Sequence, residues 1–139
     1  MNQPNDKIHI LVADDDPDIL GYFRATIKDP RYELCLVPSG TRAIEEAKNH
    51  KIDIAFLDIK MPEMGGIETL VRWKKLQPKT QIVMISSYSD GNLVREAIEK
   101  GAYTYLFKPL NKTDIFSVTV KSLKNTGIDD VFPIFTLSR

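Results

Sequence analysis

The sequence predicts an α/β fold, a doubly wound parallel sheet of five strands with helices on both faces. Five short apolar runs alternate with longer segments whose apolar residues recur at helical spacing. Parallel strands need a crossover connection, usually a helix, and these crossovers are right-handed. The apolar runs are continuous rather than alternating, which is typical of strands buried on both faces. The 139 residues fit one domain that can bury a sizeable core.

The first two strands are expected at residues 8–13 and 32–37. The helix between them begins at Asp16, whose side chain suits an N-cap, with Pro17 at the first helical position. The second helix follows Ser39. Apolar residues at helical spacing mark the inner faces of these two helices: Ile19, Leu20, Phe23 and Ile27, then Ala43, Ile44 and Ala47.

The three remaining strands are expected at residues 52–57, 81–85 and 103–107. The third helix ends before Pro78, and Trp73, in its basic stretch, is expected on a solvated face. The fourth helix starts at Asp90 and stops at Gly101, which suits a C-cap, and the fifth begins near Asn111. Their inner faces are predicted to be Ile67, Leu70 and Val71, then Leu93, Val94, Ala97 and Ile98, then Ile115, Val118 and Leu123.

Charge and composition weigh against several classes of function. Nineteen basic residues balance nineteen acidic ones, whereas general binding to nucleic acid or to a membrane surface needs a basic excess. No apolar stretch reaches the roughly 18 residues of a membrane span, and residues 1–10 do not form a signal peptide. Cys35 is the single cysteine, so no disulfide can form within the chain, and we expect a buried structural thiol. These features predict a cytoplasmic protein.

Polar side chains follow four of the predicted strands: Asp14, Asp15 and Asp16, then Asp58, then Ser86, then Lys108. Open α/β sheets place their ligand sites at the carboxyl ends of the strands, so we expect these side chains to lie close together. A carboxylate attacks a phosphoryl group poorly because both are anions, and a divalent cation relieves their repulsion. Mg²⁺ takes a few carboxylate oxygens and keeps several waters. The residues are those of a metal-assisted phosphoryl site.

In their order and spacing these residues resemble the receiver domain of two-component response regulators. The resemblance covers residues 7–125 and rests on Asp14-Asp15, the Asp-x-x-Met-Pro-x-x-x-Gly loop that begins at Asp58, Ser86, and Lys108-Pro109. It implies a flavodoxin-like sheet with strand order 2-1-3-4-5 and five helices. It assigns residues 1–125 to the receiver and leaves 126–139 as a C-terminal tail or linker, which either packs on the domain, binds a partner or leads to a further segment.

The resemblance also implies a role for each site residue. Asp58 is the expected phosphoacceptor and nucleophile, and it would form an acyl phosphate. The expected ligands of Mg²⁺ are Asp14, Asp15, Asp58 and the backbone carbonyl of Lys60. Lys108 and Ser86 would contact the phosphoryl oxygens, and the Lys108–Pro109 peptide bond is expected to be cis, which would aim the lysine inward.

Four residues would make this site a timed switch. Ser86 and Tyr105 are expected to move on phosphorylation and to change the face formed by the fourth helix, fifth strand and fifth helix, where a downstream protein would bind. Lys60 and Tyr88 are expected to slow hydrolysis of the acyl phosphate. A sensor histidine kinase or a histidine phosphotransfer protein would be the donor, and a phosphorylation-linked homodimer is left open. The chain would be a signalling switch, with self-phosphorylation and slow self-dephosphorylation as its only catalysis.

Bland interpretations exist for each residue taken singly. Asp58 suits a turn or a helix cap, and Lys108 suits a solvated surface. Ser86 suits the end of a strand, where its hydroxyl would have a hydrogen-bond partner. Tyr105 suits a half-buried aromatic on an outer strand. The aspartates after the first strand suit a helix start, but one aspartate is enough for a cap, and clustered carboxylates repel one another unless a cation is present.

Other classes of protein fit less well. A phosphatase of the haloacid dehalogenase type would carry an Asp-x-Asp-Gly-Thr-like turn after the first strand, where Pro17 replaces its flexible step. A flavin or nucleotide binder would need a phosphate-binding loop there, and the aspartates would repel a phosphate. A docking module that no longer takes phosphate would lack the acidic pair, Asp58 or Lys108. A receiver cut from a longer regulator or a hybrid kinase remains open.

Overall fold

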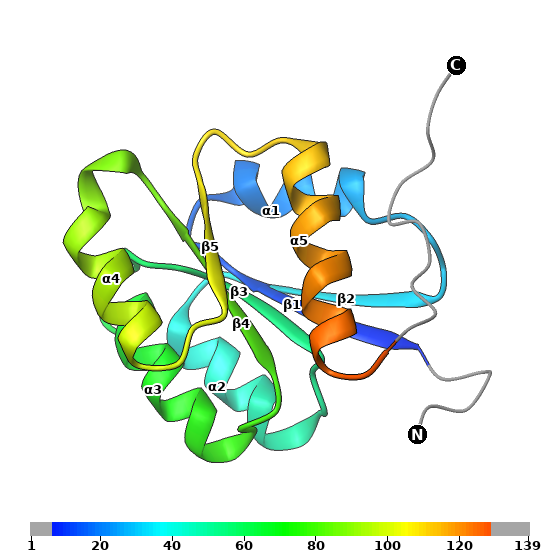
Figure 1. Cartoon of the computed structure of the whole chain (residues 1–139), viewed down its shortest axis with the longest axis horizontal. Helices are drawn as coiled ribbons and strands as arrows, with labels where there is room; N and C mark the ends of the chain where they lie inside the picture. Colours follow the sequence, from blue (N-terminus) through cyan, green and yellow to red (C-terminus); the bar gives the residue numbers. More distant parts are fainter. Residues whose placement is uncertain (1–6, 129–139) are drawn as a thin grey trace.

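The computed structural model describes residues 7–128, which form one five-stranded parallel sheet (Figure 1). In chain order the strands are β1 (Ile8–Ala13), β2 (Tyr32–Val37), β3 (Ile54–Asp58), β4 (Gln81–Ser86) and β5 (Thr104–Phe107). Across the sheet their order is β2-β1-β3-β4-β5, and every neighbouring pair is parallel. The predicted fold class and strand order are confirmed.

Five helices connect the strands: α1 (Pro17–Thr26), α2 (Gly40–Asn49), α3 (Gly66–Leu76), α4 (Gly91–Glu99) and α5 (Lys112–Asn125). A turn of 3₁₀-helix, η1 (Tyr88–Asp90), precedes α4. Helices α1 and α5 cover one face of the sheet, and α2, α3 and α4 cover the other (Figure 1). None of the helices between residues 7 and 128 has the length and apolar character needed to cross a membrane.

Each face of the sheet buries an apolar layer of its own, because successive residues of a strand point to opposite sides. In β1, Ile10 and Val12 belong to the layer under α1 and α5, whereas Leu11 and Ala13 belong to the layer under α2, α3 and α4. All four side chains are fully buried. This two-sided burial explains the continuous apolar runs of the sequence.

Three of the predicted helix starts are confirmed by capping hydrogen bonds. The side chain of Asp16 accepts a hydrogen bond from the backbone N–H of Asp18 at 2.9 Å, with Pro17 next in the helix. Ser39 caps α2 and Asn111 caps α5 in the same way. Side-chain acceptors at these positions satisfy backbone donors that have no partner within the helix.

Two strand starts differ from the prediction. β3 begins at Ile54 instead of Ile52, because the backbone N–H of Ile52 donates to the Gln77 side chain at 3.0 Å rather than to a neighbouring strand. β5 begins at Thr104 instead of Tyr103, although the N–H of Tyr103 still donates to Ile82 O at 2.7 Å. β4 runs one residue further than expected, to Ser86.

Two side chains of the helices were placed on the wrong side. Trp73 is fully buried in the layer under α3, although its basic neighbours suggested a solvated face. It lies one helical turn after Leu70, so the helical period places it on the inner face. Ile98, expected inside α4, is 41% exposed. Cys35 is half-buried, and burial is the largest cause that raises the pKa of its thiol.

Helix α5 ends at Asn125, two residues before a glycine. Gly127 has a φ of +90°, a left-handed conformation that ends a helix and favours glycine. Ile128 then packs against the apolar layer under α1 and α5. The remainder of the expected tail or linker, residues 129–139, lies outside the described residues.

Gly66 predicts a sharp effect of a single methyl group. A Cβ atom at Gly66 would collide with the backbone carbonyl of Asp58, whereas a Cβ at Gly21, within α1, would meet no atom within 4 Å. Gly66→Ala should therefore lower the free energy of unfolding by about 1–3 kcal/mol. The matched control Gly21→Ala should raise it by about 0.5–1 kcal/mol, because alanine favours a helix interior. Urea denaturation of both variants measures the difference, and equal effects would contradict the packing argument.

Candidate functional site

The strand register brings the predicted site residues to one edge of the sheet. Ala13 pairs with Leu57, so Asp14 and Asp58 follow side by side at the ends of β1 and β3. Asp58 pairs with Ile85, and therefore Ser86 lies next to it at the end of β4. Carboxyl ends of adjacent parallel strands form the crevice in which open α/β sheets bind ligands.

The three aspartates expected to bind a metal lie together. Carboxylate oxygens of Asp14, Asp15 and Asp58 are all within 4.8 Å of one another. Asp14 and Asp58 are 0% and 5% exposed, while Asp15 is exposed. Two carboxylates of the cluster are therefore buried, and the third, that of Asp15, is open to water.

Backbone hydrogen bonds fix this acidic cluster. The N–H of Asp14 donates to Val37 O at 3.2 Å, and Asp14 Oδ1 accepts from the N–H of Asp16 at 2.9 Å. After Asp58, the N–H of Ile59 donates to Ile85 O at 2.9 Å, and Gly66 donates back to Ile59 O at 2.8 Å. The carboxylates are held by rigid backbone on both sides.

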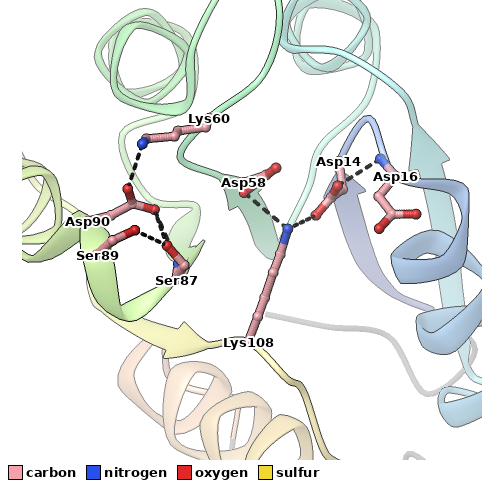
Figure 2. A network of polar contacts seen from close by, with 8 residues as sticks. All are labelled: Asp14, Asp16, Asp58, Lys60, Ser87, Ser89, Asp90 and Lys108. Carbon is pink, nitrogen blue, oxygen red and sulfur yellow. Dashed lines mark hydrogen bonds and ion pairs between the residues drawn. The ribbon is translucent and has the colours of Figure 1, made fainter.

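Lys108 reaches into the cluster from the end of β5 (Figure 2). Its N–H donates to Ser86 O at 2.8 Å, and its Nζ lies 3.4 Å from Asp14 Oδ2 and 3.6 Å from Asp58 Oδ1. The Lys108–Pro109 peptide bond is cis, as expected. One ammonium group thus contacts two buried carboxylates.

The charges at the site are not balanced. Burial, and next the charge of Asp14, raise the pKa of Asp58 to about 7. Burial also raises the pKa of Asp14, although the N–H of Asp16 and the charge of Lys108 oppose it. Burial lowers the pKa of Lys108, but the charges of Asp58 and Asp14 outweigh it, so that pKa is raised. Three carboxylates face one ammonium group, and the site favours a further cation.

These residues fit Mg²⁺ and a phosphoryl group. Carboxylate oxygens are ligands that this hard cation prefers, and the exposure of Asp15 leaves room for the waters that it keeps. The hydroxyl of Ser86 is buried without a hydrogen-bond partner among residues 7–128. A buried hydroxyl without a partner is costly, and a phosphoryl oxygen would be a suitable acceptor.

The remaining predicted residues lie around the cluster. The Lys60 ammonium pairs with Asp90, 3.0 Å away, and points away from Asp58 (Figure 2). Tyr88 is 76% exposed, and its ring centroid lies 4.3 Å from that of Phe107. Tyr105 is 39% exposed, and its ring centroid lies 4.9 Å from that of the same Phe107. These side chains are beside the site and do not enter it in this structure.

The sequence analysis missed Asp90, which it treated only as a helix start. Asp90 is 5% exposed, and its Oδ2 accepts hydrogen bonds from the N–H and hydroxyl of Ser87 at 3.2 and 3.0 Å. The hydrogen-bonded Lys60 ammonium is the largest cause that lowers the pKa of Asp90. The spacing Ser87-x-x-Asp90 resembles the spacing of a capping box and was the available signal.

Comparison with known proteins agrees with the resemblance found in the sequence. The family model described as "Response regulator receiver domain" matches residues 10–119. The transcriptional regulatory protein ZraR of Escherichia coli K12 is 34% identical over 136 residues, which are 97% of this chain and 31% of that protein. AlgB of Pseudomonas syringae pv. tomato, an alginate biosynthesis transcriptional regulatory protein, is 29% identical over 115 residues, 83% of this chain and 26% of that protein. The chain spans less than a third of either relative.

A solved structure shares the fold over nearly its whole length. It is the crystal structure of a response regulator receiver domain protein (CheY-like) from Methanospirillum hungatei JF-1. The TM-score is 0.82 at 26% sequence identity, with 89% of this chain and 99% of that chain covered.

The raised pKa of Asp58 predicts that the metal-free protein loses stability as the pH rises. The carboxyl titrates near 3.8 in the unfolded chain and at about 7 in the folded one. The folded state therefore binds this proton more tightly than the unfolded chain does. The stability that the proton contributes is fully present below the unfolded pKa, and it is lost as the pH rises from the unfolded pKa through the folded pKa. Asp58→Asn does not ionise and lacks this dependence.

Urea denaturation with a chelator at pH 5 and pH 8 measures this difference. The wild type should lose about 2–3 kcal/mol relative to Asp58→Asn, because roughly two pH units at about 1.36 kcal/mol each separate pH 5 from the folded pKa. Asp18→Asn, which alters an exposed carboxylate of α1, is the matched control and should behave as the wild type. Parallel profiles of the wild type and Asp58→Asn would contradict the prediction.

Proposed function

Since the chain belongs to the family of response regulator receiver domains, we propose that Asp58 accepts a phosphoryl group in a Mg²⁺-dependent reaction and sets a signalling switch. The placement of Asp58 carries this proposal. Its buried carboxylate lies with those of Asp14 and Asp15, and 3.6 Å from the Lys108 ammonium. A nucleophile, two further acidic groups and a cation for phosphoryl oxygens meet at one edge of the sheet.

In the proposed reaction an oxygen of Asp58 attacks the phosphorus of a phosphohistidine. A new oxygen–phosphorus bond forms the acyl phosphate, while the bond from phosphorus to the imidazole nitrogen breaks and its electron pair stays on that nitrogen. The Lys108 ammonium stabilises negative charge on the phosphoryl oxygens. The hydroxyl of Ser86, which lacks a partner among the described residues, donates a hydrogen bond to one of them.

The proposed Mg²⁺ ligands are Asp14, Asp15, Asp58 and the backbone carbonyl of Lys60. When bound, the ion neutralises charge on the two anions that must approach each other. The residues themselves prepare this step: the backbone bonds of Asp14 hold its carboxylate beside Asp58, and Asp15 faces solvent.

The switch would act through the face formed by α4, β5 and α5. Ser86 and Tyr105 are the proposed moving residues, and Tyr105 is 39% exposed on that face. A groove of about 560 Å³ opens there between β5 and α5, lined by aromatic and polar residues that include Tyr88, Phe107 and Asp114. A downstream protein would bind this face in one of the two phosphorylation states.

The wider setting is proposed from the relatives. ZraR and AlgB are named transcriptional regulatory proteins, and such a regulator or a hybrid kinase could contain this receiver as a segment. The receiver would occupy residues 1–125, and residues 126–139 would be a tail or linker. A sensor histidine kinase or a histidine phosphotransfer protein would supply the phosphoryl group in the cytoplasm. Catalysis would be limited to self-phosphorylation and slow self-dephosphorylation.

Intact-mass spectrometry after incubation with acetyl phosphate and Mg²⁺ tests the phosphoacceptor. The wild type should gain one phosphoryl group, because the small donor needs only the nucleophile, the ion and Lys108. Asp58→Asn should gain none, and a chelator should abolish the adduct of the wild type. An adduct that persists in Asp58→Asn, or no adduct with any donor, would refute the proposal.

The lifetime of the acyl phosphate is the second test. Lys60 and Tyr88, a long cation and an aromatic side chain on the loops beside Asp58, would obstruct the attacking water. The half-life in the presence of Mg²⁺ should therefore be minutes or longer. Loss of the phosphoryl mass after removal of acetyl phosphate measures it directly, and a half-life of a few seconds would contradict the prediction.

A further inference from the structure

A group of polar side chains beside the phosphoryl site is centred on Asp90. One carboxylate oxygen, Oδ2, accepts two hydrogen bonds from Ser87 and closes the turn between β4 and α4. The hydroxyl of Ser87 also lies 2.7 Å from that of Ser89. The other carboxylate oxygen, Oδ1, lies 3.0 Å from the Lys60 ammonium (Figure 2). Asp90 therefore accepts two hydrogen bonds within its own turn and forms one ion pair outside that turn.

The outside contact joins the two loops that border the site. Lys60 lies in the loop that follows β3 and Asp58, and Asp90 lies between β4 and α4, shortly after Ser86. Figure 2 shows the Lys60 side chain directed toward Asp90, while Lys108 occupies the space between Asp58 and Asp14. The ion pair therefore holds the Lys60 ammonium, the second ammonium group near Asp58, on the side of Asp90.

The two partners of this ion pair differ in burial. The side chain of Asp90 is 5% exposed, whereas that of Lys60 is 68% exposed. A buried carboxylate without a cation is costly, so Asp90 favours a cation beside its Oδ1. An exposed ammonium group can change partners with little change in its own hydration, so its position follows the stronger nearby anion.

We propose that Asp90 is a positioning residue that competes with the phosphoryl group of Asp58 for the Lys60 ammonium and thereby limits how strongly Lys60 prolongs the lifetime of the acyl phosphate. This inference rests on the proposed function of Asp58. If the charge of Asp90 is removed, the strongest anion near Lys60 is the phosphoryl group on Asp58, which precedes Lys60 by two residues in the sequence. The ammonium group then covers the phosphoryl oxygens for more of the time and obstructs the attacking water more strongly than in the wild type.

Three variants separate this role from a purely structural one. Asp90→Asn removes the charge but keeps an oxygen that can accept from Ser87. Lys60→Met removes the ammonium group and keeps the length of the side chain and the backbone carbonyl. The double variant shows whether Asp90 acts through Lys60. Glu33→Gln, which removes the exposed ion pair between Lys7 and Glu33 on the outer strand β2, is the matched control.

The half-life of the phosphorylated protein with Mg²⁺ is the measured quantity, and thermal denaturation establishes that each variant is folded. Asp90→Asn should lengthen the half-life by about two- to fivefold, the range of an ion pair with one exposed partner. Lys60→Met should shorten it, because the ammonium group that obstructs the attacking water is absent, and the double variant should match Lys60→Met. Glu33→Gln should match the wild type. If Asp90→Asn does not fold, Asp90→Ser replaces it, since serine also accepts in a cap.

The outcomes that refute the inference differ from those that refute the proposed function. No adduct on the wild type refutes both. An adduct whose half-life is unchanged in Asp90→Asn refutes the inference alone. A longer half-life in Asp90→Asn that persists in the Lys60→Met background also refutes it, because Asp90 would then act by shaping its turn and not by holding Lys60.

Discussion

The repulsion between Asp14 and Asp58 is the constraint on which this structure depends. Two buried carboxylates lie side by side at the ends of β1 and β3, and the single ammonium group of Lys108 contacts both, at 3.4 and 3.6 Å. The lysine offsets only part of the repulsion, and the pKa of Asp58 is raised to about 7 mainly because the group is buried. A site so rich in negative charge favours a cation, and the nucleophile proposed for Asp58 would be activated by one.

The rest of the domain keeps these charges in place. Apolar layers on both faces of the sheet fix the strands, and the register of β1, β3, β4 and β5 determines which residues meet at the edge. The start of α3 packs so closely behind Asp58 that only glycine fits at position 66. Unfavourable local electrostatics at a functional site are thus tolerated because the surrounding packing is strong.

Charge also links the site to its surroundings. Lys108 is bonded through its backbone to Ser86, and Lys60 is joined to Asp90 at the start of α4. A phosphoryl group on Asp58 would compete with the existing partners of both lysines. The same ammonium groups that balance the resting site would therefore respond first to the new charge. They lie on the side of the molecule where the exposed rings of Tyr88 and Tyr105 contact the partly buried ring of Phe107.

The sequence by itself determined the fold class, the order of the elements and the acidic cluster. Apolar periodicity and helix caps such as Asp16 and Ser39 are local properties, and they identify strands and helices without knowledge of their neighbours. Once the strands are parallel, residues at their carboxyl ends must share an edge, so Asp14, Asp58 and Lys108 could be placed together.

Only the tertiary structure decided which side chains act on one another. Trp73 is buried in spite of its basic neighbours, because packing against the sheet overrides the local impression of polarity. The partner of Lys60 is Asp90, a residue from another loop, and the pKa of Asp58 is set by burial and by Asp14 from another strand. Burial and charge interactions depend on distances between residues remote in sequence, and those distances exist only once the chain has folded.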